Sequence, residues 1–391
     1  GLGNIQRENS VGATFGDYDQ DGDLDLFIAH WTFTIGELPT GTPLHLWRND
    51  GDGTFSDVSD ESLITGTIIE ADFDYTFAPT FADIDSDGDM DLLVAADAGT
   101  SQVLINRGDM GGGLYTFEYG TDRDVINDEN GMGSSVADFD NDGDLDWFVT
   151  AISLGDEPEG RATPEDNAGF PLGGNRLYLN DGTGVFSDAT DTAGVRKGYW
   201  GWASCAADFN NDGYLDIFHV NGMDEPATNA YLQDPSRLFF NNGDGTFTEY
   251  AQPLGLVDTR SGRGVTCFDG DRDGDIDIIV SNNNDDVSLF RNDGGSQLNY
   301  VNISLRGEAP NTQAIGARIY ASTGGMTQLR EVHNGNNFVS QNPAEQHFGL
   351  SNAMQVDTLR VVWPDGRETS RTNITSNQRV TVVYPDSWST D

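Results

Sequence analysis

The chain has 391 residues, of which 65 are acidic and 20 are basic, and its formal net charge is −45. A field this negative repels nucleic acid and anionic membrane surfaces, so we exclude both as partners. The length allows two or three domains, and no apolar run approaches the roughly 18 residues of a membrane-spanning helix. The chain starts at Gly1 rather than Met, so a mature form without its leader and a trimmed chain both stay open.

Five stretches of nine residues share one pattern, in which acidic side chains stand at alternate positions and glycine stands at the sixth. Several unpaired aspartates are too costly to bury in a core strand, but they suit a hard cation. Calcium takes about six to eight oxygen ligands, and a glycine at position six lets the side chains at positions 1, 3, 5 and 9 point inward while position 7 offers its carbonyl. The predicted calcium ligands are Asp17, Asp19, Asp21, Asp23 and Asp25; Asp83, Asp85, Asp87, Asp89 and Asp91; Asp138, Asp140, Asp142, Asp144 and Asp146; Asp208, Asn210, Asp212, Tyr214 and Asp216; and Asp269, Asp271, Asp273, Asp275 and Asp277.

An EF-hand and a plain solvated turn both fit these loops less well. An EF-hand needs a glutamate at position 12 between two helices, whereas position 12 lies here in a strand-like apolar run and is Ile28, Val94, Val149, His219 or Val280. A solvated acidic turn would not need glycine at every sixth position. The fourth copy departs most from the pattern, because Asn210 replaces an aspartate and Tyr214 stands at position 7. We therefore predict about five calcium sites on turns between strands.

A second marker, Asn-Asp-Gly or Asn-Asn-Gly, recurs between the loops at 49–51, 180–182 and 241–243, with weaker versions at Asn106 and Asn292. It is typical of a hairpin turn. The loops begin 66, 55, 70 and 61 residues apart, a period that indicates propeller blades of four strands each. Residues 1–296 are thus predicted to form an all-β propeller with five recognisable blades, and a count of up to seven stays open. Because the chain starts just before the first loop, closure of the ring by the opening residues beside the last blade stays open as well. The long connections 61–79 and 155–174 are candidate binding insertions.

After about Gln297 the acidic loops stop and short alternating runs follow. Residues 297–391 are predicted to form a second, small β domain, either a sandwich or a compact barrel. The two cysteines, Cys205 and Cys267, are 62 residues apart, about one repeat. A disulfide between neighbouring blades and two buried thiols both stay open, and the thiols are the simpler alternative.

These motifs resemble two known families. The Asp-x-Asp-x-Asp-Gly-x-x-Asp loops are similar to the FG-GAP (VCBS) repeat of integrin α-subunit propellers. The tail resembles the ASPIC/UnbV domain of the cartilage acidic protein-like family in the stretches 314–319, 328–341, 347–350 and 361–366. The resemblance implies an extracellular, calcium-stabilised propeller used for adhesion or matrix contacts, and it implies no reaction. Integrin propellers typically have seven blades, which is why a count above five stays open.

Signals for other sites are weak. The histidines are scattered, and neither a nucleophile elbow nor a phosphate loop is present, so the sequence predicts no enzyme. The tripeptide 107–109, Arg-Gly-Asp, matches an adhesion motif but also fits a hairpin turn. Trp200 and Trp202 would either stack on sugar or pack inside a blade. Asn302 and Asn373 begin glycosylation sequons.

The prediction that joins these observations is a secreted calcium-binding adhesion or structural protein. Its partners would be an extracellular protein, a glycan or copies of itself, and calcium-dependent self-assembly into ordered oligomers or filaments is a variant. One alternative is a carbohydrate-binding module. Another is a polysaccharide-acting lyase or hydrolase, which would need a polar cluster in the central channel.

Overall fold

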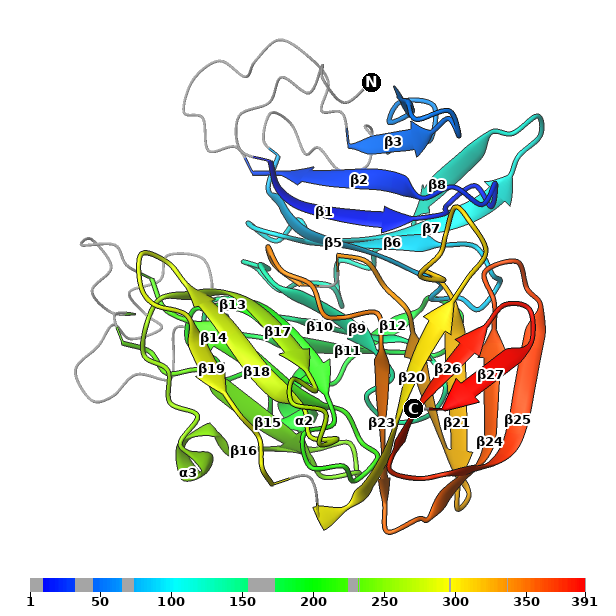
Figure 1. The fold of residues 1–391 in the computed structure, drawn as a ribbon. Coiled ribbons are helices and arrows are strands. Elements are labelled where there is room, and N and C mark those ends of the chain that lie inside the picture. Colours follow the sequence, from blue (N-terminus) through cyan, green and yellow to red (C-terminus); the bar gives the residue numbers. More distant parts are fainter. Residues whose placement is uncertain are drawn as a thin grey trace.

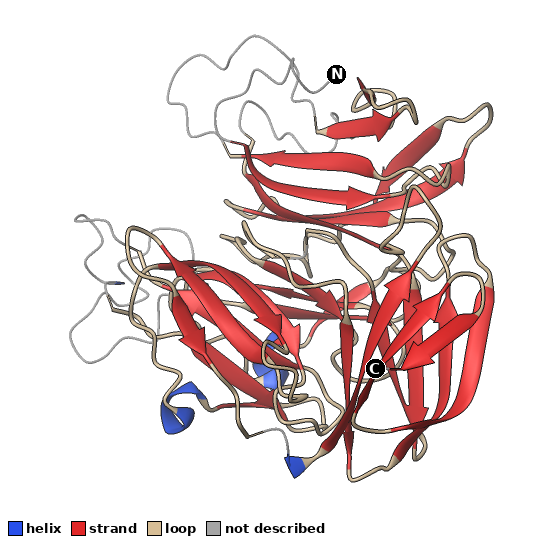
Figure 2. Ribbon diagram, in the orientation of Figure 1, coloured by secondary structure: helices blue, strands red, loops and turns tan. Residues whose placement is uncertain are grey.

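The computed structural model describes residues 10–31, 45–64, 74–153, 173–223, 231, 233–294, 297–335 and 337–390. Strands dominate this part of the chain (Figure 2), and the helices α2 (Thr190–Ala193) and α3 (Ala251–Leu254) are single turns. Most of the two long connections predicted as binding insertions, 61–79 and 155–174, lies outside the described residues.

Strands β1 to β19 form five antiparallel sheets in chain order, which we call blades 1 to 5 (Figure 1). Their bounds are β1 (Ser10–Gly16), β2 (Asp25–His30), β3 (Leu46–Asn49) and β4 (Phe55–Asp57); β5 (Thr76–Ala82), β6 (Asp91–Ala96), β7 (Gln102–Asp109) and β8 (Tyr115–Tyr119); β9 (Ser134–Ala137), β10 (Asp146–Val149), β11 (Arg176–Asn180) and β12 (Phe186–Asp188); β13 (Gly201–Ala207), β14 (Asp216–Asn221), β15 (Arg237–Asn241) and β16 (Phe247–Glu249); and β17 (Gly262–Phe268), β18 (Asp277–Asn282) and β19 (Ser288–Phe290).

The predicted all-β propeller with five recognisable blades is confirmed. Each acidic loop joins the first and second strands of a blade, and in blades 1, 3 and 4 the Asn-Asp-Gly or Asn-Asn-Gly turn joins the third and fourth. The prediction of four strands in every unit is wrong for the fifth, because its sheet contains only β17, β18 and β19 among the described residues. After Asn292 the chain leads into the tail strand β20 instead of returning beside β19.

The first strands of the blades line the centre and are linked by hydroxyl groups. The Thr80 and Ser134 side chains connect β5 to β9 at 3.4 Å, and the Ser135 and Ser204 side chains connect β9 to β13 at 2.8 Å. Between β13 and β17 the link is covalent, because Cys205 and Cys267 form a disulfide. The alternative of two buried thiols, which looked simpler from the sequence, is thus not the one observed.

Asparagines of the hairpin markers connect each of blades 2 to 5 to the blade before it. The Asn106 side chain of blade 2 donates to the Tyr18 carbonyl of blade 1 at 2.8 Å, and Asn180 of blade 3 donates to the Ile84 carbonyl at 2.7 Å. Asn241 and Asn292 repeat this contact onto blades 3 and 4. The sequence showed these residues only as turn formers, although they also hold neighbouring blades in register.

The tail folds as a sandwich rather than a barrel. One sheet has the order β23-β20-β26-β27 and the other has the order β22-β21-β24-β25. Between them lies a core that includes Trp363 and Phe348. The strand bounds are β20 (Asn299–Arg306), β21 (Arg318–Thr323), β22 (Met326–Glu331), β23 (Gln346–Ser351), β24 (Gln355–Val362), β25 (Glu368–Thr375), β26 (Gln378–Val383) and β27 (Ser387–Thr390).

The tail also enters the ring between its first and last blades. Residues 332–335 and 337–343, which follow β22 and are orange in Figure 1, contact both inner strands there. The Asn334 carbonyl accepts from the Thr14 hydroxyl of β1 at 2.5 Å, and Asn342 accepts from the Cys267 N–H of β17 at 3.0 Å. Phe338 packs against Phe77 and Trp202. We call residues 332–335 and 337–343 the closing segment, because they connect blade 5 to blade 1.

Candidate functional site: acidic loops beneath the tail domain

The five acidic loops share one backbone geometry, which explains their sequence pattern. Glycine at position six has φ between 93° and 99° in all five, a left-handed conformation that residues with a Cβ rarely adopt. This conformation lets the N–H groups of the loop turn inward. In the fourth loop the Asp208 carboxylate accepts from Asp212 N–H at 3.1 Å and from Gly213 N–H at 2.8 Å. Position 1 therefore organises the loop as well as offering a ligand.

Position 9 has a structural role of its own. The Asp146 carboxylate accepts from the N–H of Phe139 at 2.9 Å and from the N–H of Asn180 on the third strand at 3.0 Å. The same two contacts occur in every blade, through Asp25, Asp91, Asp216 and Asp277. Sequence reasoning treated position 9 only as a ligand. Its hydrogen bonds fix the loop to the sheet whether or not a cation is bound.

The loops bring carboxylates together in four places. In each, three ligand oxygens lie within 4.8 Å of one another. The groups are Asp17, Asp19 and Asp25; Asp83, Asp85 and Asp91; Asp138, Asp140 and Asp146; and Asp269, Asp271 and Asp273. The fourth loop does not form such a group of acids, since position 3 is Asn210. The ligand assignments at the other predicted positions, including the Asp23, Asp89, Asp144, Tyr214 and Asp275 carbonyls, stay predictions.

The electrostatics of these groups favour a cation. Burial, with repulsion from neighbouring aspartates as a smaller contribution, raises the pKa of Asp17 to about 7 and that of Asp25 to about 9. The same causes act in the third loop, where the pKa of Asp138 rises to about 7. Buried carboxylate oxygens without a hydrogen-bond partner occur in all four groups. They are Asp19 Oδ1, Asp83 Oδ1, Asp85 Oδ1, Asp138 Oδ2 and Asp269 Oδ1.

Oxygen-only donor sets of this kind fit Ca²⁺, a hard cation. The aspartates at positions 1 and 3 would hold it, joined by position 9 in the first three groups and by position 5 in the last. When bound, a divalent cation would supply the positive charge that offsets clustered and partly desolvated carboxylates.

Arginines from the tail lie directly against two of these loops. Arg318 of β21 forms an ion pair with Asp83 at 3.3 Å, and its guanidinium also donates to the Asp83 carbonyl. Arg379 of β26 pairs with Asp269 at 2.6 Å. Asn302 of β20 donates to the same carboxylate at 3.0 Å. The tail thus rests on position 1 of two acidic loops, a relation that sequence spacing cannot show because each arginine is more than 100 residues from its carboxylate.

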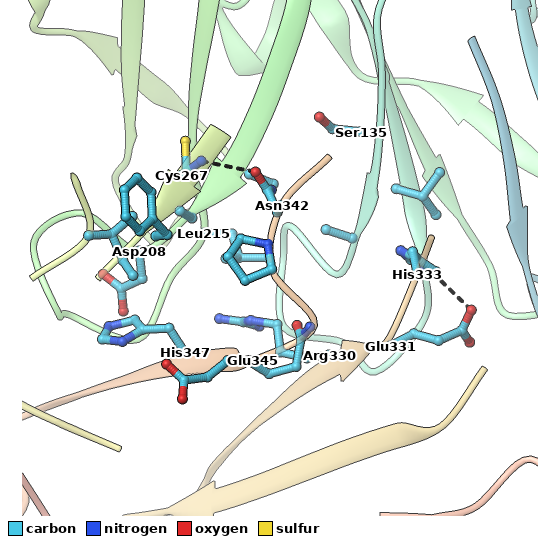
Figure 3. A pocket seen from close by; sticks show the side chains of 18 of the residues that line it. Ser135, Asp208, Leu215, Cys267, Arg330, Glu331, His333, Asn342, Glu345 and His347 are labelled. Atoms are coloured by element: carbon cyan, nitrogen blue, oxygen red, sulfur yellow. Dashed lines mark hydrogen bonds and ion pairs between the residues drawn. The ribbon is translucent and has the colours of Figure 1, made fainter. Parts of the chain in front are cut away.

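A cavity of about 170 Å³ lies between the inner strands and the tail. Figure 3 shows Arg330, Glu345 and His347 of the tail facing Asp208 of the propeller. Most of the charged groups around it have partners. Arg379 donates to Glu345, and both ring nitrogens of His347 lie within hydrogen-bond distance of an asparagine side chain.

The remaining sequence candidates have structural roles. Trp202 is buried, stacks with Trp200 at 6.3 Å and has the Arg263 guanidinium of blade 5 at 4.0 Å from its ring, so it is a packing residue between blades at the centre of the ring. Asp109 closes the β7–β8 turn by accepting from the N–H of Gly111, in agreement with the hairpin interpretation of the tripeptide. Asn302 is buried, whereas Asn373 is exposed.

Comparison with known proteins agrees with this architecture. Residues 17–94, 83–149 and 167–219 match the FG-GAP-like repeat, and residues 307–388 match the ASPIC and UnbV family. Cartilage acidic protein 1 of Homo sapiens is 26% identical, with 54% of this chain and 41% of that protein covered, and the Mus musculus protein is 27% identical, with 54% and 42% covered. The chain therefore spans about two fifths of the length of these relatives.

Among solved structures, the chain is similar to Trypanosoma rangeli sialidase in complex with sialic acid, with a TM-score of 0.36 and 11% identity over 70% of this chain and 43% of that chain. In the described part of the chain, no helix has the length and apolar character needed to cross a membrane. The family matches and the curated relatives together identify this chain as a protein of FG-GAP-like repeats with a C-terminal ASPIC and UnbV domain, similar to cartilage acidic protein 1.

Proposed function

We propose that this chain is an extracellular structural or adhesion protein, stabilised by calcium in its acidic loops and without catalytic activity. The observation that carries the calcium proposal is the set of four carboxylate groups with partnerless buried oxygens. The disulfide between Cys205 and Cys267 supports an extracellular location, because such bonds persist in oxidising compartments. The similarity to cartilage acidic protein 1 supports the same location.

The proposal of no catalytic activity rests on the centre of the ring. At one end Phe77, Trp202 and Phe338 pack together. At the other end tail residues line the polar cavity, and several of its acidic side chains have partners: Glu331 pairs with His333, and Glu345 pairs with Arg379. A polysaccharide-acting enzyme would need an open polar cluster at this place.

The test is thermal unfolding of the full chain as a function of calcium concentration, with EDTA and magnesium as controls. Calcium at millimolar concentration, which fills extracellular modules of this kind, is expected to raise the melting temperature well above the EDTA value. The variant Asp140→Asn should reduce that rise, and Asp181→Asn, a change in the exposed turn between β11 and β12, should not. An equal melting temperature with calcium and EDTA would overturn the calcium proposal.

Self-assembly is tested by light scattering on the same samples. Cations between acidic molecules would reduce the repulsion that a charge of −45 creates, so assembly is expected to appear with calcium and to disappear with EDTA. If the protein stays monomeric with calcium and with EDTA, self-assembly is excluded, and the proposed adhesion role is limited to contacts with molecules other than copies of this chain.

A further inference from the structure

The outer edge of blade 5 is exposed where the other blades are covered. In blades 1 to 4 a fourth strand pairs with the third, whereas the described residues of blade 5 end the sheet at β19. The second and third strands pair in the same register in all five blades, so equivalent positions can be compared directly. The position of Leu289 in blade 5 is occupied in blades 1 to 4 by Leu46, Val103, Leu177 and Leu238.

Exposure at this position separates blade 5 from the others. The four equivalent side chains are between 0% and 2% exposed, because both the outer segment of their own blade and the strands of the following blade pack against them. Among the described residues, Leu289 has no following blade on this face; it is 64% exposed, and the nearby Val287 is 63% exposed. Phe290 is only half-buried, although its counterparts in the other blades are all buried. An apolar strand edge in this state is both costly in water and open to pairing with another strand.

The segment that covers the third strand has the same design in all four complete blades. A phenylalanine of the outer strand pairs with the hairpin asparagine; the pairs are Asn49 with Phe55, Asn106 with Phe117, Asn180 with Phe186 and Asn241 with Phe247. Three residues later an N–H donates to the carbonyl at the Leu289-equivalent position. These bonds run from Val58 to Leu46, Gly120 to Val103, Ala189 to Leu177 and Tyr250 to Leu238.

An aliphatic side chain completes the cover. It stands nine residues after the phenylalanine in every case and packs in the same apolar cluster as the Leu289-equivalent residue. These side chains are Ile64, Ile126, Val195 and Leu256. In three blades a hydroxyl four residues after the phenylalanine also accepts from the third strand. It belongs to Ser59, Thr121 or Thr190.

We propose that the edge of β19 is a docking site for an extended segment of a partner protein that carries a phenylalanine and, nine residues later, an aliphatic residue. The phenylalanine would lie opposite Asn292, and the aliphatic side chain would cover Leu289. Strand addition of this type draws its affinity from main-chain hydrogen bonds and its specificity from side chains at alternate positions. The proposal gives the adhesion role a partner of defined chemistry, and it does not depend on calcium in the loops.

A different protein fits this site better than a second copy of the chain. The four segments of this pattern in the described residues are all engaged in their own blades. A second copy could donate one only by opening a complete blade. A partner with a free segment of the same pattern has no such cost.

The experiment uses a fluorescent peptide with the sequence of residues 50–64, which contains Phe55, Ser59 and Ile64. The peptide is titrated with the full chain, and hydrogen exchange of the backbone amides is followed by mass spectrometry. We expect saturable binding and slower exchange confined to the region of β19. The variant Leu289→Lys is expected to weaken binding at least tenfold, as is the peptide change Phe55→Ala.

The matched control is Val185→Lys in the turn of blade 3, a side chain with 62% exposure that lies away from any open edge. This variant should bind the peptide as the unchanged chain does. Three outcomes would overturn the proposal: no binding, β19 amides that are already protected in the free chain, or a concentration-dependent dimer that Leu289→Lys abolishes. The second would mean that residues of this chain cover the edge, and the third that a second copy does.

Discussion

At the residue scale, the aspartates of one loop have separable roles. Asp146 at position 9 accepts two buried backbone N–H groups, whereas Asp140 at position 3 is exposed and faces other carboxylates. Removal of the first should damage the fold itself, and removal of the second should matter only when a cation is present. The loops are thus both structural turns and candidate ligand sets, with different residues dominating each role.

This difference predicts that two variants lose different amounts of stability in EDTA. Asp146→Ala leaves the N–H groups of Phe139 and Asn180 without their acceptor and should lower the free energy of unfolding by about 3 kcal/mol even in EDTA. The loss should be larger in calcium, because the same substitution also removes a proposed ligand of the third loop. Asp140→Ala should be close to neutral in EDTA, because it removes repulsion, and destabilising in calcium. Chemical denaturation under both conditions measures this. Equal losses for the two variants in EDTA would contradict the division of roles.

His219 of blade 4 predicts a dependence of stability on pH. Burial lowers its pKa to about 3, while in the unfolded chain the pKa is close to 6.5. The unfolded state therefore takes up a proton that the folded state does not, and stability present above about pH 6.5 is lost as the pH falls. At pH 5 the loss from this group is about 2 kcal/mol.

The variant His219→Gln keeps a polar partner for Asn175, 3.2 Å away, but cannot titrate. Its free energy of unfolding should fall less between pH 7 and pH 5 than that of the unchanged chain. Denaturant titrations at both pH values give the difference. An equal fall in the free energy of unfolding for both proteins between pH 7 and pH 5 would show that His219 is protonated without penalty in the folded state.

At the element scale, the closing segment connects the first and last blades and fills part of the centre of the ring. Phe338 is buried against Phe77 and Trp202, but the next side chain, Val339, is 54% exposed. Phe338→Ala should therefore cost about 3 to 5 kcal/mol of stability. Val339→Ala, one position away, should change it by less than about 0.5 kcal/mol. A small effect of both substitutions in a denaturation experiment would contradict a closing role for the segment.

The sequence could predict those elements that repeat a local pattern, such as the acidic turns. The sixth residue adopts a left-handed conformation in all five acidic loops. Glycine at this position therefore identifies each of the five turns from the local sequence alone. That the described residues give blade 5 only three strands could not be predicted, because the weak turn marker at Asn292 resembles the others until the chain enters the tail. The closing segment could not be predicted either, since its contacts with β1 join residues about 320 positions apart.

The contacts of the tail arginines with the acidic loops could not be predicted from local sequence patterns either. Nothing in the alternation of β21 or β26 distinguishes Arg318 and Arg379 from surface charges. Only the structure places them on Asp83 and Asp269. The predicted ligand positions depended on spacing within nine residues, whereas the residues that cover the loops depend on how two domains pack.

At the scale of the whole molecule, the propeller and the tail depend on each other. Ion pairs join them at two acidic loops, and the closing segment lies inside the ring. We expect a single calorimetric transition for the full chain in calcium, because unfolding of either part breaks the ion pairs and the closing-segment contacts that stabilise the other. Phe338→Ala should split or broaden this transition, and Val339→Ala should leave it unchanged. Two separate transitions in the unchanged chain would contradict the coupling.

The place of the closing segment in the sequence has a consequence for synthesis. Blades 1 to 5 leave the ribosome first, but the residues that connect blade 5 to blade 1 are 332–335 and 337–343. Until they emerge, a nascent chain holds five blades with an unfilled centre and exposed inner strands. Pauses in translation after about residue 294 would lengthen the time in which those strands can pair with other nascent chains. Synthesis of the last quarter of the sequence thus ends the period in which the inner strands are exposed to pairing with other nascent chains.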